Sequence, residues 1–273
     1  MTTQQMLSYL RKGISKYQLI RDGDKIAVGV SGGKDSVVLL KLLAEYKRFS
    51  PEKFDLIAVT VDLDFTDKKT DFTPISALCK DLGVEYYVEK TEIGKIVFDV
   101  RKESNPCALC SKMRKGALNN VAKQKGCNKI ALGHHYNDVI ETILMGMLYG
   151  GQVQTMMPKL HSTNFAGMQL IRPLYLIREA DILHWRDYNN LRFLQCACRF
   201  TEKAASEDLS ATSKRLEIKR LIQQLRATNP YIESNIFRSV ENVTLDTVIA
   251  YKKKGVTHHF LDNYNECNSS EEE

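Results

Sequence analysis

The hexapeptide Ser31-Gly32-Gly33-Lys34-Asp35-Ser36 constrains this chain more than any other segment. It follows residues 26–30, a short apolar run typical of a buried strand, and precedes residues 37–43, whose apolar side chains recur at helical spacing. A pair of glycines between two such segments predicts a tight loop. The sequence therefore predicts a strand, a loop and a helix, with the loop at the N-terminus of the helix.

This loop has the composition of an anion-binding site. At a helix N-terminus, unpaired backbone N–H groups and the helix dipole attract anions. Glycines let a phosphate approach the backbone, the two serines offer hydroxyls, and Lys34 adds a positive charge. The alternative is a glycine turn with a capping serine and no ligand. The composition of the loop therefore predicts a phosphate-binding site.

The spacing of the loop differs from the Walker A pattern, which has four residues between its first glycine and its Gly-Lys pair. It resembles instead the pyrophosphate loop of the N-type ATP pyrophosphatases. This resemblance implies an enzyme that cleaves ATP between its α and β phosphates. It also implies that all six residues, 31–36, bind ATP and that Lys34 and Asp35 are catalytic.

Strand and helix patterns alternate along most of the chain. A helical pattern covers residues 4–20, and apolar runs typical of strands follow at 26–30, 56–61, 85–88, 130–132 and 169–171. This alternation predicts an α/β fold with a parallel sheet of about five strands and helices on both faces. Ligands bind such sheets at the carboxyl ends of the strands, so the hexapeptide and Gly133-His134-His135 are expected to face one cleft.

The pattern also suggests how the chain is divided. We expect an N-terminal helix over residues 1–22, a pyrophosphate-loop ATPase domain over 23–180, a helical C-terminal extension over 181–262 and a disordered acidic tail over 263–273. No apolar stretch is long enough for a membrane span, and no signal-peptide region is present. The expectation is a cytoplasmic protein without membrane contact.

The chain carries a net charge of +6, a surplus that suits a polyanionic partner. Each basic cluster taken alone is more often a solvated helix face. Together with an ATP-activating loop, these clusters predict a phosphate track for RNA. The candidate RNA-binding residues are Lys112, Arg114, Lys115, Lys214, Arg215 and Lys219.

Seven cysteines are too few and too unevenly placed for a disulfide scaffold. Two close pairs stand out, Cys107/Cys110 and Cys196/Cys198, whereas Cys79 and Cys127 are expected to be small buried residues. Four thiolates would close a structural zinc site. Three thiolates would hold an iron–sulfur cluster with one open iron position, and a persulfide-bearing pair without metal is a third alternative.

A third motif, Gly133-His134-His135-Tyr136-Asn137-Asp138, lies at a predicted strand end. A single histidine is usually a packing residue, but this run is better placed to touch ATP or its Mg²⁺. We therefore expect Gly133 and His134 to bind ATP, together with Asp62 at the end of the second strand.

The three motifs, in this order, resemble the tRNA 2-thiocytidine synthetase family, the cluster-dependent tRNA sulfurtransferases. The resemblance runs from about residue 15 to about residue 245. It also includes Tyr149-Gly150-Gly151, Met157-Pro158-Lys159-Leu160, Ile171-Arg172-Pro173-Leu174, Arg178-Glu179-Ala180-Asp181-Ile182 and Asn235-Ile236-Phe237-Arg238. It implies a pyrophosphate-loop domain, ATP, Mg²⁺ held by Asp138 and Asp35, and a [4Fe-4S] cluster. The implied cluster ligands are Cys107, Cys110 and one of Cys196 and Cys198, and Cys107 and Cys110 are also expected to be catalytic.

Two positions depart from the family pattern. Asn137 stands where a second acidic residue is usual, which removes one carboxylate that could face Mg²⁺. Only Ala197 separates the later cysteines, where two residues are usual, so the third cluster ligand is left open between Cys196 and Cys198.

The resemblance implies an ATP-dependent transferase that adenylates the C2 carbonyl of an anticodon-loop cytidine in tRNA and replaces its oxygen with sulfur. Its partners would be tRNA and a sulfur donor, either a desulfurase persulfide or sulfide, and a homodimer is compatible with this function. One alternative is thiolation or desulfuration of a different base or of a free nucleobase. An alternative of another class is a non-catalytic zinc or iron–sulfur protein that binds RNA.

Overall fold

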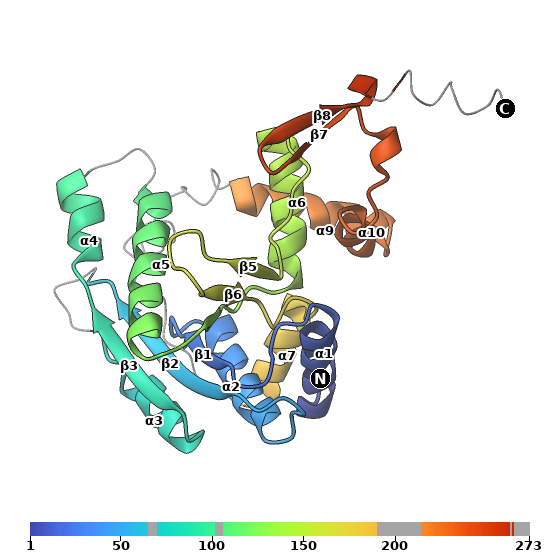
Figure 1. Cartoon of the computed structure of the whole chain (residues 1–273). Helices are drawn as coiled ribbons and strands as arrows, with labels where there is room; N and C mark the ends of the chain where they lie inside the picture. The colour runs from blue at the N-terminus through green and yellow to red at the C-terminus, as the bar shows by residue number, and fades with distance from the viewer. Residues whose placement is uncertain (65–69, 102–105, 190–213, 263, 265–273) are drawn as a thin grey trace. The chain divides into compact units, whose positions relative to one another are not determined.

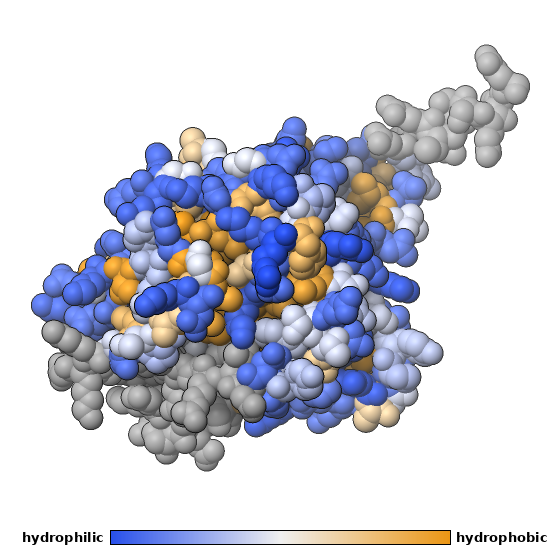
Figure 2. Space-filling view, turned by 90° about the horizontal axis from the view of Figure 1, so that it is seen from below, coloured by the Kyte–Doolittle hydropathy of each residue, from blue (hydrophilic) through white to orange (hydrophobic). Residues whose placement is uncertain are grey.

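A computed structural model describes residues 1–64, 70–101, 106–189, 214–262 and 264 of the chain (Figure 1). By their contacts, the residues divide into two compact units, Met1–Leu221 and Ile222–Glu273. None of the described helices is both long and apolar enough to cross a bilayer. On the face drawn in Figure 2, hydrophilic residues form most of the surface and apolar residues gather toward the middle.

The first unit contains a six-stranded sheet in the order β3-β2-β1-β4-β6-β5. Neighbours from β3 to β6 run parallel, and β5 runs antiparallel to β6. The strands are β1 (Lys25–Gly29), β2 (Asp55–Asp62), β3 (Glu85–Lys90), β4 (Lys129–Ala131), β5 (Lys159–His161) and β6 (Gln169–Ile171). The predicted parallel α/β sheet is confirmed, with one more strand than expected.

Helices cover both faces of this sheet. Described helices of the first unit are α1 (Thr3–Lys16), α2 (Lys34–Lys47), α3 (Thr73–Asp81), α4 (Ile93–Lys95), the π-helix η1 (Ile96–Arg101), α5 (Pro106–Gln124), α6 (Tyr136–Gly150) and α7 (Glu179–Tyr188). Another helix, α9 (Lys214–Thr228), crosses the division between the units.

Alternation along β1 explains why both faces are buried. Ile26 and Val28 point into the core shared with α1, α2, α3 and α7, while Ala27 packs on the opposite side with Leu118 and Val121 of α5. Successive strand residues point to opposite faces, so a strand that is apolar throughout requires helices on both sides.

A buried ion pair closes the amino ends of the central strands. Lys129, the first residue of β4, lies 2.5 Å from the carboxylate of Asp24 and also donates to the carbonyl of Leu19 at 2.9 Å. Asp24 additionally accepts bonds from the backbone N–H of Arg21 and the side chain of Asn128. Burial alone would raise the pKa of Asp24, but these donors outweigh it and lower that pKa.

Two elements differ from the sequence predictions. The edge strand β5 was not predicted, because its three residues form no apolar run and it is held by pairing with β6. The expected helical C-terminal extension is helical in α7, α9 and α10 (Ile232–Ser239), but it also contains a hairpin.

The hairpin belongs to the second unit, where β7 (Ala250–Lys253) pairs with β8 (Val256–His259), flanked by the short 3-10 helices η3 (Leu245–Thr247) and η4 (Phe260–Asp262). Its turn residues Lys254 and Gly255 both have positive φ, as a type I′ turn requires. The lysine run around this turn concealed the strand pattern in the sequence.

Candidate active site

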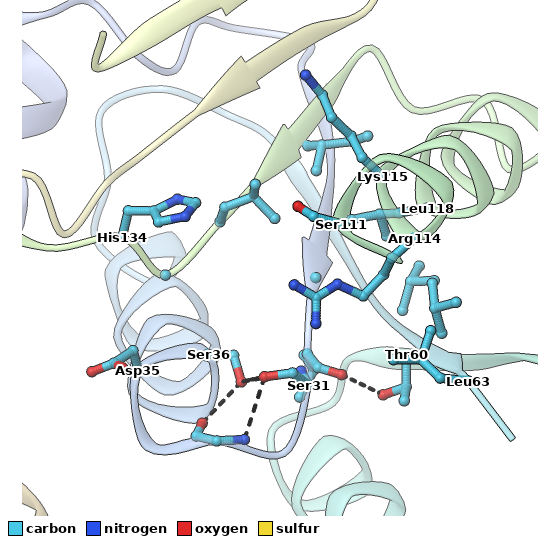
Figure 3. A pocket seen from close by; sticks show the side chains of 18 of the residues that line it. Ser31, Asp35, Ser36, Thr60, Leu63, Ser111, Arg114, Lys115, Leu118 and His134 are labelled. Carbon is cyan, nitrogen blue, oxygen red and sulfur yellow. Dashed lines mark hydrogen bonds between the residues drawn. The ribbon is translucent and has the colours of Figure 1, made fainter. Parts of the chain in front are cut away.

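The loop between β1 and α2 is closed by its own serines. The hydroxyl of Ser36 donates to the carbonyl of Gly33 at 2.9 Å and accepts from the backbone N–H of Ser31 at 3.1 Å (Figure 3). Gly32 adopts a φ of 83°, which favours glycine. Gly33 is the N-cap of α2, and no side chain caps this helix. The N–H groups of the first turn are therefore in the arrangement that binds anions.

The loop that follows β4 is pressed against this helix N-terminus. A Cβ atom built on Gly133 would lie 2.9 Å from the carbonyl carbon and oxygen of Asp35 and 3.0 Å from the nitrogen of Ser36. Such distances exclude any side chain, since the obstructing atoms are backbone. Glycine at position 133 thus brings the histidine motif and the hexapeptide together.

The two loops line a cavity of about 550 Å³, a size typical of small-molecule sites. The wall opposite His134 comes from α5, from which Arg114 extends its guanidinium over the loop (Figure 3). The predicted site residues on the cavity wall are Ser31, Gly33, Asp35, Ser36, Asp62, Arg114, Lys115, Gly133, His134 and Asp138. The predicted residues Gly32, Lys34, Cys107, Cys110 and Lys112 are described but do not line it.

The side chain of Lys34 is directed to two carboxylates. Its Nζ lies 2.9 Å from Asp35 and 3.1 Å from Glu179, at the start of α7, and Glu179 in turn lies 2.7 Å from Lys219 of α9. Burial alone would raise the pKa of Glu179, but its bonds from Lys219 and Lys34 outweigh burial and lower that pKa to about 2. For Lys34, bonds to Asp35 and Glu179 likewise outweigh burial, and its pKa is raised.

Asn137 explains how Glu179 is held in place. Its side-chain oxygen accepts a hydrogen bond from the backbone N–H of Glu179 at 2.9 Å, and Asn137 does not line the cavity. The residue that departs from the family pattern therefore anchors the first turn of α7. The sequence showed Glu179 only as part of a matching segment and offered no sign of its pairing with Lys34.

The predicted RNA-binding residues of α9 are engaged in other contacts. Arg215 lies 3.0 Å from Asp138 and 3.7 Å from Glu141, and Lys214 lies over the ring of Tyr149. Burial raises the pKa of Glu141 to about 6. Lys112, Arg114 and Lys115 of α5 are exposed, as are Lys214 and Arg215 of α9. An RNA-binding role remains a prediction for both groups.

Arg172, which follows β6, is a wall residue that was not predicted as a site residue. Its Nε donates to Nδ1 of His134 at 3.3 Å, and its guanidinium also bonds the carbonyl oxygen of Met157. Burial lowers the pKa of His134 to about 4 and that of Arg172 to about 10. The sequence feature that could have identified Arg172 is a charged residue directly after an apolar strand.

The cysteines of the first pair lie three residues apart near the start of α5, a spacing that puts both on one side of the helix. Cys107 is exposed, Cys110 is half-buried, and neither forms a disulfide with another described residue. Ser111, the next residue, lines the cavity. This donor set suits two ligands of a metal cluster, while Cys196 and Cys198 lie outside the described residues.

The part of the chain that the structure describes contains no group of three or more His, Cys, Asp or Glu side chains able to hold a metal. Asp35 and Asp138 both line the cavity. Two carboxylates fit Mg²⁺, because this ion takes most of its ligands from water and nucleotide phosphates. The isolated Cys79 and Cys127 are buried, as predicted, and burial raises the pKa of each to about 11.

Comparison with known proteins agrees with this geometry. A family model described as a PP-loop domain matches residues 3–198. A tRNA-cytidine(32) 2-sulfurtransferase from Syntrophotalea carbinolica is 36% identical over 85% of this chain and 86% of its own. A tRNA-cytidine(32) 2-sulfurtransferase 2 from Francisella tularensis is 35% identical over 89% of this chain and 92% of its own.

A solved structure shares the fold as well. The U34-tRNA thiolase NcsA from Methanococcus maripaludis, determined with its [4Fe-4S] cluster, superimposes with a TM-score of 0.69 at 26% identity. The match covers 87% of this chain and 77% of the thiolase.

Proposed function

Since this chain belongs to the PP-loop family and, within it, to the tRNA-cytidine(32) 2-sulfurtransferases, we propose that it is an ATP-dependent tRNA sulfurtransferase. Its substrate would be a cytidine of the anticodon loop, whose C2 oxygen is exchanged for sulfur. The observation that carries the proposal is one cavity with a pyrophosphate-type loop on one wall and the helix of Cys107 and Cys110 on another.

The first step activates the base. The C2 oxygen of the cytidine attacks the α-phosphorus of ATP, an O–P bond forms, and the bond between the α-phosphorus and the bridging oxygen breaks. Pyrophosphate leaves with the electron pair. The backbone N–H groups at the start of α2 and the ammonium of Lys34 stabilise the charge that develops on it. Asp35 and Glu179 orient the ammonium of Lys34 for this role.

Mg²⁺ would be held by Asp35 and Asp138 together with phosphate oxygens. When bound, it neutralises phosphate charge and fixes the phosphates in position. In the structure, one oxygen of Asp138 is paired with Arg215. Metal binding would compete with this ion pair for the carboxylate.

The second step replaces the activated oxygen. A sulfur atom at the oxidation level of sulfide attacks C2, a C–S bond forms, and the C2–O bond breaks with AMP as the leaving group. Cys107, Cys110 and one of Cys196 and Cys198 would hold the cluster. When bound, a three-thiolate [4Fe-4S] cluster supplies one iron position that no protein thiolate fills. The partners are tRNA and a sulfur donor, which is either sulfide or a desulfurase persulfide together with a reductant that supplies two electrons. We also propose a cytoplasmic protein that acts as a homodimer.

Anaerobic purification followed by iron, sulfide and zinc analysis tests the cluster, and nucleoside analysis of tRNA treated with protein, ATP and sulfide tests the reaction. We expect 2-thiocytidine together with AMP and pyrophosphate. Cys107→Ala or Cys110→Ala should remove iron and thiolation together, and only one of Cys196→Ala and Cys198→Ala should do the same. One bound zinc, no iron and no thiolated base would contradict the proposal and favour a zinc protein that binds RNA.

A further inference from the structure

Arg172 is a buried cation on the wall of the cavity. Only 8% of the surface of Arg172 is exposed, and the residue lines the same cavity as the loop after β1. A guanidinium has five N–H bonds and no acceptor. The two bonds that the structure shows go to neutral partners, the ring of His134 and the carbonyl of Met157.

No carboxylate forms an ion pair with Arg172 anywhere in the described ranges. Asp138 exerts a weaker electrostatic effect on it, but this carboxylate is paired with Arg215. A buried charge without a counterion is costly unless a ligand supplies the opposite charge. Because Arg172 remains protonated at neutral pH, the charge that would balance it is an anion in the cavity.

The contact between Arg172 and His134 also defines the tautomer of the histidine. Arginine can only donate, so Nδ1 of His134 must accept. The neutral imidazole then carries its proton on Nε2, where it is a donor. Both side chains thus present N–H groups, and no acceptor, to a bound group.

We propose that Arg172 and His134 form a phosphoryl-binding pair for the α-phosphoryl group of the nucleotide, separate from the loop that binds pyrophosphate. The position follows from Gly133, which places His134 next to the first turn of α2. The α-phosphoryl group is the group that passes from ATP to the base, and it adjoins the pyrophosphate. This inference rests on the proposed function for the identity of the anion.

Binding of AMP to the full chain is the direct test, because AMP carries the α-phosphoryl group and no pyrophosphate. Loss of a charge-assisted hydrogen bond typically costs about ten- to a hundredfold in affinity. We expect Arg172→Met to weaken AMP binding by this factor, with adenosine and pyrophosphate binding unchanged. Lys159→Met is the matched control, since Lys159 is a cation on neighbouring β5 that does not line the cavity.

A second pair of variants keeps the test sharp if Arg172→Met folds poorly. His134→Gln can still place an N–H near the position of Nε2, whereas the shorter side chain of His134→Asn reaches only the position of Nδ1. We expect AMP affinity to fall more in His134→Asn. Nitrogen-15 spectra of His134 at neutral pH should show the proton on Nε2 in the wild-type protein and a mixture of tautomers in Arg172→Met.

The outcomes separate the two proposals. If the wild-type protein thiolates tRNA but Arg172→Met binds AMP like the wild type, the phosphoryl-binding pair is wrong. Weaker tRNA binding with unchanged AMP binding would also overturn it, because the anion would then be an RNA phosphate. If AMP binding falls as expected but no tRNA is thiolated by the wild type, the proposed function fails and the phosphoryl site remains.

Discussion

Two buried cations lie at opposite ends of the paired strands β4 and β6. Lys129 begins β4 with 2% of its surface exposed, and Arg172 follows β6 with 8% exposed. Lys129 has a carboxylate partner in Asp24, whereas the contacts of Arg172 are with neutral groups. The same sheet therefore carries a balanced charge at its amino edge and an unbalanced one at its carboxyl edge.

This difference indicates a structural role for the paired Lys129 and a ligand-binding role for Arg172. A buried ion pair whose polar atoms are all hydrogen-bonded within the protein has no charge or hydrogen-bonding group left for a ligand. Ligands of parallel α/β sheets bind at the carboxyl edge, and there the cation faces a cavity. The comparison predicts that substitutions at the two edges affect different measurable quantities.

The largest effect is expected from Lys129→Met. The substitution leaves the carboxylate of Asp24 buried without its cation, a change that typically costs about 3–5 kcal/mol. Urea denaturation should show this loss in the free energy of unfolding, and Asp24→Asn combined with Lys129→Met should recover part of it. Arg172→Met should lose less than about 1 kcal/mol, because it removes an unbalanced charge. Equal losses at the two positions would break the comparison.

Lys34→Ala tests the carboxyl edge through activity. Removing a preorganised charge from a developing anion typically slows a reaction about a hundredfold or more. Pyrophosphate release in the presence of tRNA should fall by this factor, and Asp35→Ala should act in the same direction. The free energy of unfolding should change little, since Lys34 lies outside the core. Turnover within a few-fold of the wild type would remove the loop from the mechanism.

A smaller effect is expected from Glu179→Gln, which removes the carboxylate between Lys34 and Lys219. Lys34 would lose one of its two anionic contacts, and we expect pyrophosphate release to slow about tenfold, within the range of one charged hydrogen bond. Asp181→Asn is the control, because Asp181 lies in the same turn of α7 and does not contact Lys34. A similar loss in both variants would indicate a general effect on α7.

The smallest effect concerns salt dependence. Each lost phosphate contact lowers the slope of tRNA affinity against salt by about one unit. Lys112→Gln combined with Lys115→Gln should lower it by about two, because these side chains are exposed. Arg215→Gln combined with Lys219→Gln should change it less, since Asp138 and Glu179 already hold both cations. The reverse order would mean that α9 carries the RNA contacts.

The centre of the sheet was predictable because β1 and β2 are largely apolar and buried, which makes residues 26–30 and 56–61 stand out. The strand β5 was not, since its pairing with β6 depends on tertiary context that three residues do not encode. The hairpin of the second unit was hidden by its lysines, although Gly255 was the available turn signal.

The candidate site shows the same division. The hexapeptide and Gly133-His134 were found because close backbone approach and anion binding demand particular residue types in sequence. Glu179 and Arg172 were missed because their roles depend on partners far along the chain, Lys34 and His134. The position of Asn137 was noted, but only the structure shows that its side chain bonds the backbone of Glu179.

The contact of Gly133 with the backbone of Asp35 and Ser36 has a consequence for how such chains diversify. The separation between the hexapeptide and His134 equals the thickness of two peptide chains in contact, so substitution cannot widen or narrow it. On that side of the cavity, the width available to the nucleotide is set by backbone contact. Adaptation to another base or another RNA would therefore arise on the α5 side, where the side chains of Ser111, Arg114 and Lys115 line the cavity.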